Sequence, residues 1–159
     1  MTSRIFTQTF AVVAALIEEE GRFLLVKEAG GPEAGTWNLP AGWLDVGEDP
    51  ILGAKREAEE ETGRDFMPTH LLGVYSLVKA NLAEKLQGTP HAIKLVFVGT
   101  VSRQSHPLAS DVSETRWFTP DEIDALGGSL RDPDIKQQVA DYLSGVRFPL
   151  SAIRHTIQG

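Results

Sequence analysis

The sequence contains no cysteine. This absence excludes disulfide bonds, zinc sites built on thiolates and a thiol nucleophile. The chain also has no run of about 18 consecutive apolar residues, the length that a membrane-spanning helix needs. Its first residues, Met1 to Arg4, are not followed by the apolar block of a secretory signal peptide. These absences predict a cytoplasmic protein that does not act at a membrane.

Clusters of lysine and arginine are missing as well. The net charge of the 159 residues is −7, whereas a nucleic-acid-binding protein usually presents a basic face. We therefore expect no nucleic-acid partner. Internal repeats and low-complexity tracts are also absent. The length predicts one domain, covering residues 1–159, with a hydrophobic core of its own.

Hydrophobic runs separated by turn residues predict an early hairpin. Residues 7–16 and 23–26 are expected to form its strands, and Glu20-Gly21 its turn. The segment 29–36 is rich in Gly and Pro, which indicates a loop. Residues 37–42 then form a short extended piece.

The second half of the chain alternates in the same way. Strands are expected at 71–78, 92–101 and 114–118, with a polar loop at 79–91, helices beginning at Thr119-Pro120 and Asp132-Pro133, the latter ending near Leu143, and a tail without periodicity from about 146. The order of strands, helix, strands and helices fits a mixed α/β sandwich, in which one helix packs against a central sheet.

The first helix has the clearest limits. Asp49 is a good N-cap and Pro50 suits the first helical position, so the helix is expected over 50–62. Gly63 follows as the expected left-handed residue at the C-terminus. Its core-facing side is predicted to consist of Ile51, Ala54, Ala58 and Thr62.

Three carboxylates share another face of this helix. Glu57, Glu60 and Glu61 stand at i, i+3 and i+4, so they repel one another, and the helix dipole disfavours anions in the last turn. A divalent cation would remove both penalties. Carboxylates without Cys or His indicate a hard ion such as Mg²⁺, with Mn²⁺ possible. The alternative is a solvated acidic helix end.

The spacing around these carboxylates forms a longer pattern. Five residues separate Gly42 from Glu48, and seven separate Glu48 from Arg56-Glu57; Glu60, Glu61 and Gly63 complete it. The segment resembles the Nudix box, the signature of the Nudix hydrolase family. The resemblance covers roughly residues 6–143 and implies the Nudix fold, an α/β/α sandwich with a mixed central sheet. Ala58 and Arg64 depart from the usual aliphatic residues, and neither is an expected ligand.

The resemblance also implies residue roles. Glu57, Glu60, Glu61 and the backbone carbonyl of Ala41 are expected to bind the metal ions. Glu48 and Arg56 are expected to form an ion pair that orients the loop against the helix, with Gly42 and Gly63 as structural support. The simpler interpretation of Arg56 is an exposed partner of Glu60, one helical turn away.

The general base that activates water has several candidates. Glu60 is the first choice and Glu57 the second. In some Nudix relatives the base lies on a later loop, where Asp111 and Glu114 are the candidates here. Glu114 can equally be a charge at a strand edge.

Two further residues are candidate substrate-binding groups. Lys94 interrupts an apolar strand, and it either faces inward to hold a substrate phosphate or lies on the solvent face. Trp43 either stacks on a ring of the substrate or is an ordinary core or rim aromatic.

The expected reaction is hydrolysis of a phosphoanhydride bond in a nucleoside di- or triphosphate or a related small diphosphate. Near the C-terminus lie Arg131-Asp132-Pro133, Tyr142-Leu143-Ser144-Gly145 and Phe148-Pro149-Leu150. They resemble a bacterial Nudix group of phosphatases that act on nucleoside di- and triphosphates and on thiamine pyrophosphate or its pyrimidine precursor. The alternatives are a nucleotide-sugar or dinucleotide pyrophosphatase and a non-catalytic nucleotide-binding module. The isomerases that share this fold need a cysteine, so they are excluded. The protein is expected to be a monomer or homodimer.

Overall fold

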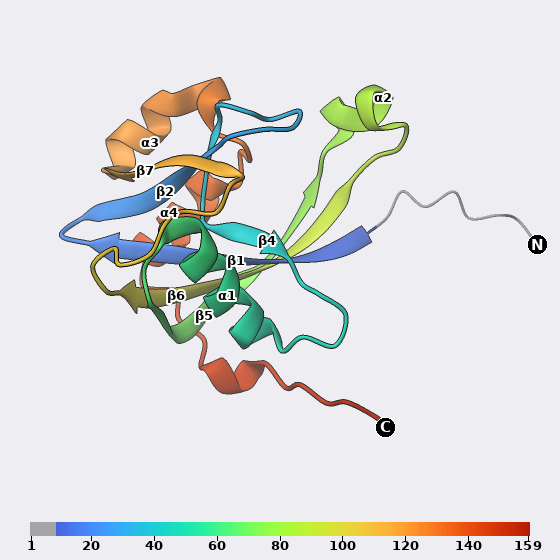
Figure 1. Ribbon diagram of the computed structural model, residues 1–159, viewed down its shortest axis with the longest axis vertical. Coiled ribbons are helices and arrows are strands. Elements are labelled where there is room, and N and C mark those ends of the chain that lie inside the picture. The colour runs from blue at the N-terminus through green and yellow to red at the C-terminus, as the bar shows by residue number, and fades with distance from the viewer. Residues whose placement is uncertain (1–8) are drawn as a thin grey trace, which may run out of the picture.

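A mixed sheet positions every other element of the protein (Figure 1). The computed structural model describes residues 9–159, and within this range the sheet has seven strands. They are β1 (Thr9–Glu19), β2 (Arg22–Glu28), β3 (Trp37–Asn38), β4 (Ala41–Trp43), β5 (Phe66–Val78), β6 (His91–Val101) and β7 (Val112–Phe118). The order is β3-β2-β1-β6-β5; β4 also pairs with β1, and β7 with β2. The pair β1–β6 is parallel and the other pairs are antiparallel, which confirms the mixed sheet.

Alternating side chains of β1 define two helical layers. Ala14 and Leu16 face a core that includes Ile123 of α3 (Pro120–Leu126) and Val139 of α4 (Ile135–Leu143). The residues between them, with Ala15 as an example, face the opposite layer, which contains α1 (Pro50–Thr62). Successive residues of a strand point to opposite faces of the sheet, so one strand serves both layers. The predicted α/β/α sandwich is confirmed.

The predicted limits of α1 are confirmed. The Asp49 carboxylate accepts hydrogen bonds from the backbone N–H groups of Ile51 and Leu52, at 2.8 and 3.4 Å. Gly63 has a φ of 65°, and its N–H donates to the carbonyl of Glu59 at 2.9 Å. The helix packs in front of the sheet (Figure 1). Of the predicted core-facing residues, Ala54, Ala58 and Thr62 are buried and Ile51 is half-buried.

The predicted hairpin is also present. Glu20 and Gly21 have φ values of 51° and 77°, the left-handed conformations of a tight two-residue turn. Pairing at this turn extends β1 to Glu19, three residues beyond the predicted end. Residues 7 and 8 of the predicted strand lie outside the described residues. The predicted loop at 29–36 is confirmed.

Several expected boundaries were wrong. β5 begins at Phe66 instead of Leu71, because it is the edge strand, where Pro68 interrupts no ladder on the open side. The expected loop at 79–91 contains a 3₁₀ turn, η1 (Ala80–Leu82), and a one-turn helix, α2 (Ala83–Leu86). Its Ala, Leu, Glu and Lys residues are strong helix formers, which outweighs the polar character of the segment.

The last helix also begins later than expected, at Ile135 instead of Pro133. The Asp132 carboxylate contacts the ammonium groups of Lys79 and Lys94 at 2.6 Å each, so it does not cap the helix. After α4, the tail runs beside β5. Leu71 and Phe148 exchange two backbone hydrogen bonds of 2.9 Å, and Ile153 packs against the core beneath α1. No helix in residues 9–159 is long and apolar enough to span a membrane.

Gly63→Ala should lower the free energy of unfolding by about 2–4 kcal/mol, measured by urea denaturation. A Cβ at this position would lie 2.1 Å from the backbone oxygen of His106, and the left-handed φ strains any other residue. Gly128→Ala is the control, because its φ is not in the left-handed region and no described atom lies within 4 Å of its added Cβ. It should change stability by less than about 1 kcal/mol. Equal effects of the two changes would contradict the role given to Gly63.

Candidate functional site

The face of α1 that carries the carboxylates lies against the backbone of β4. A Cβ built on Gly42 would lie 2.1 Å from the carboxyl carbon of Glu57. Only glycine leaves room for this contact. One position earlier, the N–H of Ala41 donates to the carboxylate of Glu61 at 3.2 Å. The Ala41–Gly42 backbone therefore holds two of the three predicted metal ligands beside β1.

Arg56 connects the preceding loop to this helix. Its guanidinium donates two hydrogen bonds to Glu48, from Nε at 2.7 Å and Nη2 at 3.0 Å. Nη1 donates to Glu57 at 2.7 Å and more weakly to Glu60 at 3.4 Å. Hydrogen bonds from Arg56 hold the pKa of Glu48 below its usual range. The expected ion pair is present, and the alternative contact with Glu60 is present beside it.

Glu61 is the most deeply buried acid of the site, at 3% exposure. Burial raises the pKa of its carboxyl to about 9, and the charge of Glu28 adds to the shift, while the N–H of Ala41 opposes it. Burial also raises the pKa of Glu57, although Arg56 opposes that shift. Burial therefore disfavours the charged form of both carboxyl groups, and of the two only Glu57 has the guanidinium of Arg56 beside it.

The three carboxylates and the backbone at Ala41 are all oxygen donors, which suits a hard divalent cation. Such a cation would also favour the charged form of Glu61 and Glu57, which burial disfavours. Within residues 9–159, however, no three acidic or His side chains already stand together as a metal site. Glu57 and Glu60 are both turned toward Arg56. Binding of one cation by all three carboxylates would require these two side chains to turn away from Arg56.

The candidates for the general base differ in their surroundings. The Glu60 side chain is 52% exposed, which leaves its carboxylate accessible to water. Of the two loop residues, Asp111 is close enough for its charge to raise the pKa of both Glu57 and Glu61. Glu114 instead lies on β7 and pairs with Arg116 at 2.7 Å and Lys27 at 3.8 Å. The surroundings of Glu114 are those of a strand-edge charge.

Lys94 faces inward and is only 5% exposed. Its ammonium contacts the carboxylates of Asp132 at 2.6 Å and Asp134 at 2.8 Å. The interpretation as a solvent-facing residue was therefore wrong. Its ammonium is already paired with two carboxylates, and contact with a substrate phosphate stays a prediction.

Trp43 is 66% exposed at the end of β4. Its ring lies 5.1 Å from that of Phe10, measured between centroids. This position is a rim position, with a free face toward solvent.

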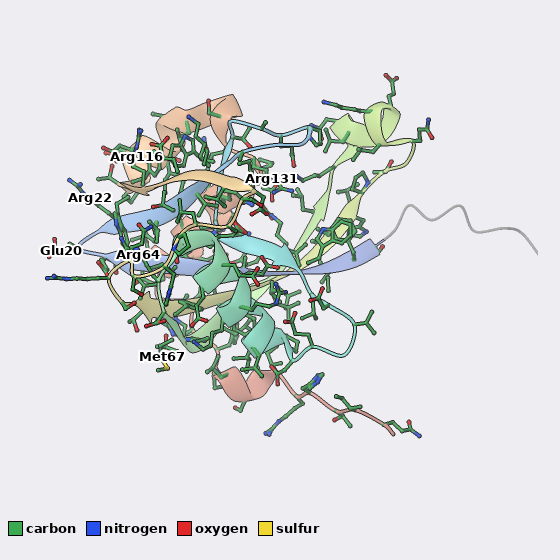
Figure 2. All side chains as sticks on the ribbon, in the orientation of Figure 1. Glu20, Arg22, Arg64, Met67, Arg116 and Arg131 are labelled. Atoms are coloured by element: carbon green, nitrogen blue, oxygen red, sulfur yellow. The ribbon has the colours of Figure 1, made fainter. Side chains whose placement is uncertain are left out.

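A cavity of about 130 Å³ adjoins the carboxylates and shares Ala41 and Gly42 with them. Its walls are mostly apolar, with Phe10, Leu39 and Ala92 among them. Ion pairs close one side: Glu33 of the 29–36 loop contacts Lys79 at 2.8 Å and Arg131 at 2.7 Å. Figure 2 labels Arg131 in the upper middle of the molecule, between α3 and α2 of Figure 1. The cavity is therefore bounded by segments far apart in the sequence.

The NUDIX domain family profile matches residues 7–139. The chain belongs to the Nudix family. The phosphatase NudJ of Escherichia coli K12 is 33% identical over 141 residues, which cover 89% of this chain and 88% of NudJ. A NUDIX hydrolase from Nitrosomonas europaea has a TM-score of 0.84 at 34% identity and covers 94% of this chain and 98% of its own. A MutT NUDIX hydrolase from Burkholderia pseudomallei has a TM-score of 0.62 at 30% identity, covering 72% and 86%.

These findings confirm the predicted family, the Nudix fold and the enzyme class, a hydrolase. The Nudix box thus occupies the loop and helix that the structure brings against Ala41 and Gly42.

Sequence reasoning missed the residues on the other side of the site. Asp132 was noted only as a helix start and in the C-terminal resemblance, Gln138 carried no motif, and Glu28 lies in an ordinary strand, so no local signal placed them at the site.

Arg56→Lys should lower the free energy of unfolding by about 1–3 kcal/mol in urea denaturation. Lysine cannot donate in a bidentate way to Glu48 and also reach Glu57, so the half-buried carboxylates lose hydrogen bonds. Arg103→Lys, in an exposed loop, is the matched control and should stay within about 0.5 kcal/mol of the wild type. Indistinguishable midpoints for the two variants would rule out Arg56 as the link between loop and helix.

Proposed function

We propose that the protein is a Mg²⁺-dependent hydrolase, with Mn²⁺ as a possible substitute, that cleaves a phosphoanhydride bond in a nucleoside di- or triphosphate or a related small diphosphate. The observation that carries this proposal is that the carboxylates of α1 and the apolar cavity border on the same backbone segment. The carboxylates of α1 and the ring-sized apolar cavity meet at Ala41 and Gly42. A substrate with its ring in the cavity would place its phosphates beside the carboxylates.

Glu57, Glu60, Glu61 and the carbonyl of Ala41 are proposed to hold the cation. The ion would lower the pKa of the attacking water and stabilise charge on the bridging and leaving oxygens. Each of these donors has a structural reason to be near the phosphates. Glu57 and Glu61 contact the Ala41–Gly42 backbone, and Glu60 is one turn away on the same helical face. Glu48 and Gly63 support the site by fixing the two ends of this segment.

Glu60 is proposed as the general base that accepts the proton from the attacking water at its carboxylate. Its accessibility supports this role. Glu57 is more buried and already accepts a hydrogen bond from Arg56, so it comes second. Asp111 is the remaining loop candidate, because its charge acts on both buried glutamates. Arg56 positions the carboxylates without contacting the reacting atoms.

The name of the relative NudJ, a phosphatase, supports a small phosphorylated substrate. The cavity has the size of a site for one ring, since a cavity of roughly 150 Å³ holds a benzene molecule. A nucleoside phosphate matches this space better than a dinucleotide, whose second nucleoside needs a site of its own. The cytoplasmic location, the absence of nucleic-acid and membrane partners, and the monomeric or dimeric state stay predictions.

We also infer that residues 1–159 form one domain. The backbone bridge between Leu71 and Phe148 and the packing of Ile153 join the tail, which begins at about 146, to the same core.

Glu60→Gln should reduce Mg²⁺-dependent turnover by about 10²-fold or more, because the amide neither accepts the proton nor carries the charge that binds the cation. The measurement is product identification by mass spectrometry over a panel of nucleoside di- and triphosphates, thiamine pyrophosphate, ADP-ribose and dinucleoside polyphosphates. Glu20→Gln is the control. Figure 2 shows Glu20 at the outer end of the β1–β2 turn, where the same change should leave turnover within about twofold.

Asp111→Asn separates the candidates for the base. A loss as large as that of Glu60→Gln, with cation affinity retained, would move the role of base to Asp111. If wild-type protein turns over no member of the panel with either Mg²⁺ or Mn²⁺, the proposed function is wrong.

A further inference from the structure

The cavity beside the carboxylates is apolar on most sides, but one wall carries a buried carboxamide. Gln138 lies on α4 and is only 1% exposed. Gln138 is one of the residues that line the cavity. Helix α4 packs on the sheet face opposite α1. Gln138 therefore borders the cavity from the layer that does not carry the Nudix box.

The amide nitrogen of Gln138 has no hydrogen-bond partner among the residues that the structure describes. Leaving a buried donor unpaired costs free energy, so nearly all such groups in folded proteins are paired. The neighbouring Gln137 shows the ordinary arrangement, because its exposed amide donates to Asp141 at 2.8 Å. Within α4, the amide nitrogen of Gln138 is thus a buried hydrogen-bond donor for which the described residues provide no acceptor.

The cationic side chains of the same wall are paired with carboxylates. Lys94 and Lys79 both contact the Asp132 carboxylate, and Lys79 also contacts Glu33. Burial by itself would raise the pKa of Asp132, but the charges of the two lysines outweigh it and hold the pKa below its usual range. Asp132 therefore remains an ionised acceptor. The wall offers neutral and anionic hydrogen-bonding groups, and its cations are already paired.

A purely aliphatic group would fill the apolar part of the cavity but leave Gln138 unpaired. A planar ring with polar atoms at its edge would fill the same space and also pair with the amide, which presents both a donor and an acceptor. The pyrimidine or purine ring of a nucleotide has this combination of apolar faces and a polar edge. The cavity volume of about 130 Å³ suits a ring of this kind.

We propose that Gln138 is a specificity-determining residue, whose carboxamide hydrogen-bonds to the polar edge of a nucleobase-type heterocycle bound in this cavity. The inference rests on the proposed function, since the phosphates of the same substrate would lie at the carboxylates of α1. The ring enters the cavity past Ala41 and Gly42, and the Gln138 amide distinguishes a heterocycle from an aliphatic chain of similar size. Discrimination of this type is strong, because the wrong substrate leaves a buried polar group unpaired.

The test compares Gln138→Met with Gln137→Met on the same helix. Methionine keeps the length of the side chain and removes its hydrogen-bonding atoms. kcat/KM is measured for the nucleoside diphosphates and for n-octyl diphosphate, which lacks a polar ring edge. Gln138→Met should lower kcat/KM for at least one nucleoside diphosphate by about tenfold or more. It should change the value for octyl diphosphate by less than about threefold, and Gln137→Met should leave both unchanged.

A second experiment needs no variant and covers the case in which Gln138→Met does not fold. Wild-type protein is given the preferred nucleoside diphosphate and an analogue in which a phenyl ring replaces the base. The analogue fills the cavity but has no polar edge. Its kcat/KM should therefore be lower than that of the nucleotide by about tenfold or more.

The outcomes separate the inference from the proposed function. Equal losses on nucleoside and octyl substrates would show a merely structural role for Gln138 and overturn the inference. So would equal turnover of the phenyl analogue and the nucleotide, or a wild-type preference for octyl diphosphate. If no substrate is turned over, the proposed function fails. Calorimetric titration with nucleoside diphosphates then decides the inference: weaker binding by Gln138→Met than by Gln137→Met supports it, and equal binding overturns it.

Discussion

The arrangement of the site depends on one constraint, which is that several carboxylates must stay close together although they repel one another. The backbone of β4 and the guanidinium of Arg56 make this possible. Gly42 lets the Glu57 carboxyl approach the chain, and Arg56 links Glu57 to Glu48 by short hydrogen bonds. Glu61 receives only the N–H of Ala41, and burial raises its pKa to about 9. The fold thus stabilises the Glu57 carboxylate through Arg56, whereas the Glu61 carboxyl is left without a cation beside it among the described residues. In the proposed function, a divalent cation supplies this missing positive charge.

The same short piece of backbone joins the carboxylates to the cavity. Ala41 and Gly42 contact the α1 carboxylates and also line the apolar space. The opposite wall is held by ion pairs that connect three distant segments, namely Glu33 of the 29–36 loop, Lys79 after β5 and Asp132 before α4. These pairs cost desolvation, which is recovered only when each charge has close partners. Neutralising the lysines in this way leaves hydrogen bonding and shape, rather than net positive charge, to select what enters the cavity.

Local signals gave reliable predictions where a few adjacent residues decide the conformation. Asp49, Pro50 and Gly63 limit α1 because a cap, a first-turn proline and a left-handed glycine act within one turn of the chain. In the 79–91 segment, strong helix formers outweighed the polar character that predicted a loop. The boundaries of β5 and α4 were wrong for a different reason. In β5 and α4 the outcome depends on distant partners: β5 starts where an edge position tolerates Pro68, and α4 starts after Asp132 has paired with Lys79 and Lys94. Such partners leave no periodic trace in the sequence.

The sequence by itself determined the family, the α/β/α architecture and the helix face that carries Glu57, Glu60 and Glu61, because these follow from fixed spacings along one segment. Only the tertiary structure decided the pairing of Lys94 and the burial of Gln138 beside the cavity. Lys94 read equally well as an inward phosphate ligand or a solvent-facing residue until Asp132 and Asp134 were seen to neutralise it. Gln138 is an unremarkable helical residue in the sequence, and it becomes a candidate only when α4 packs it against the cavity. The physical reason is that spacing along a helix fixes which side chains share a face, whereas burial and charge pairing are set by elements that meet only in the folded chain.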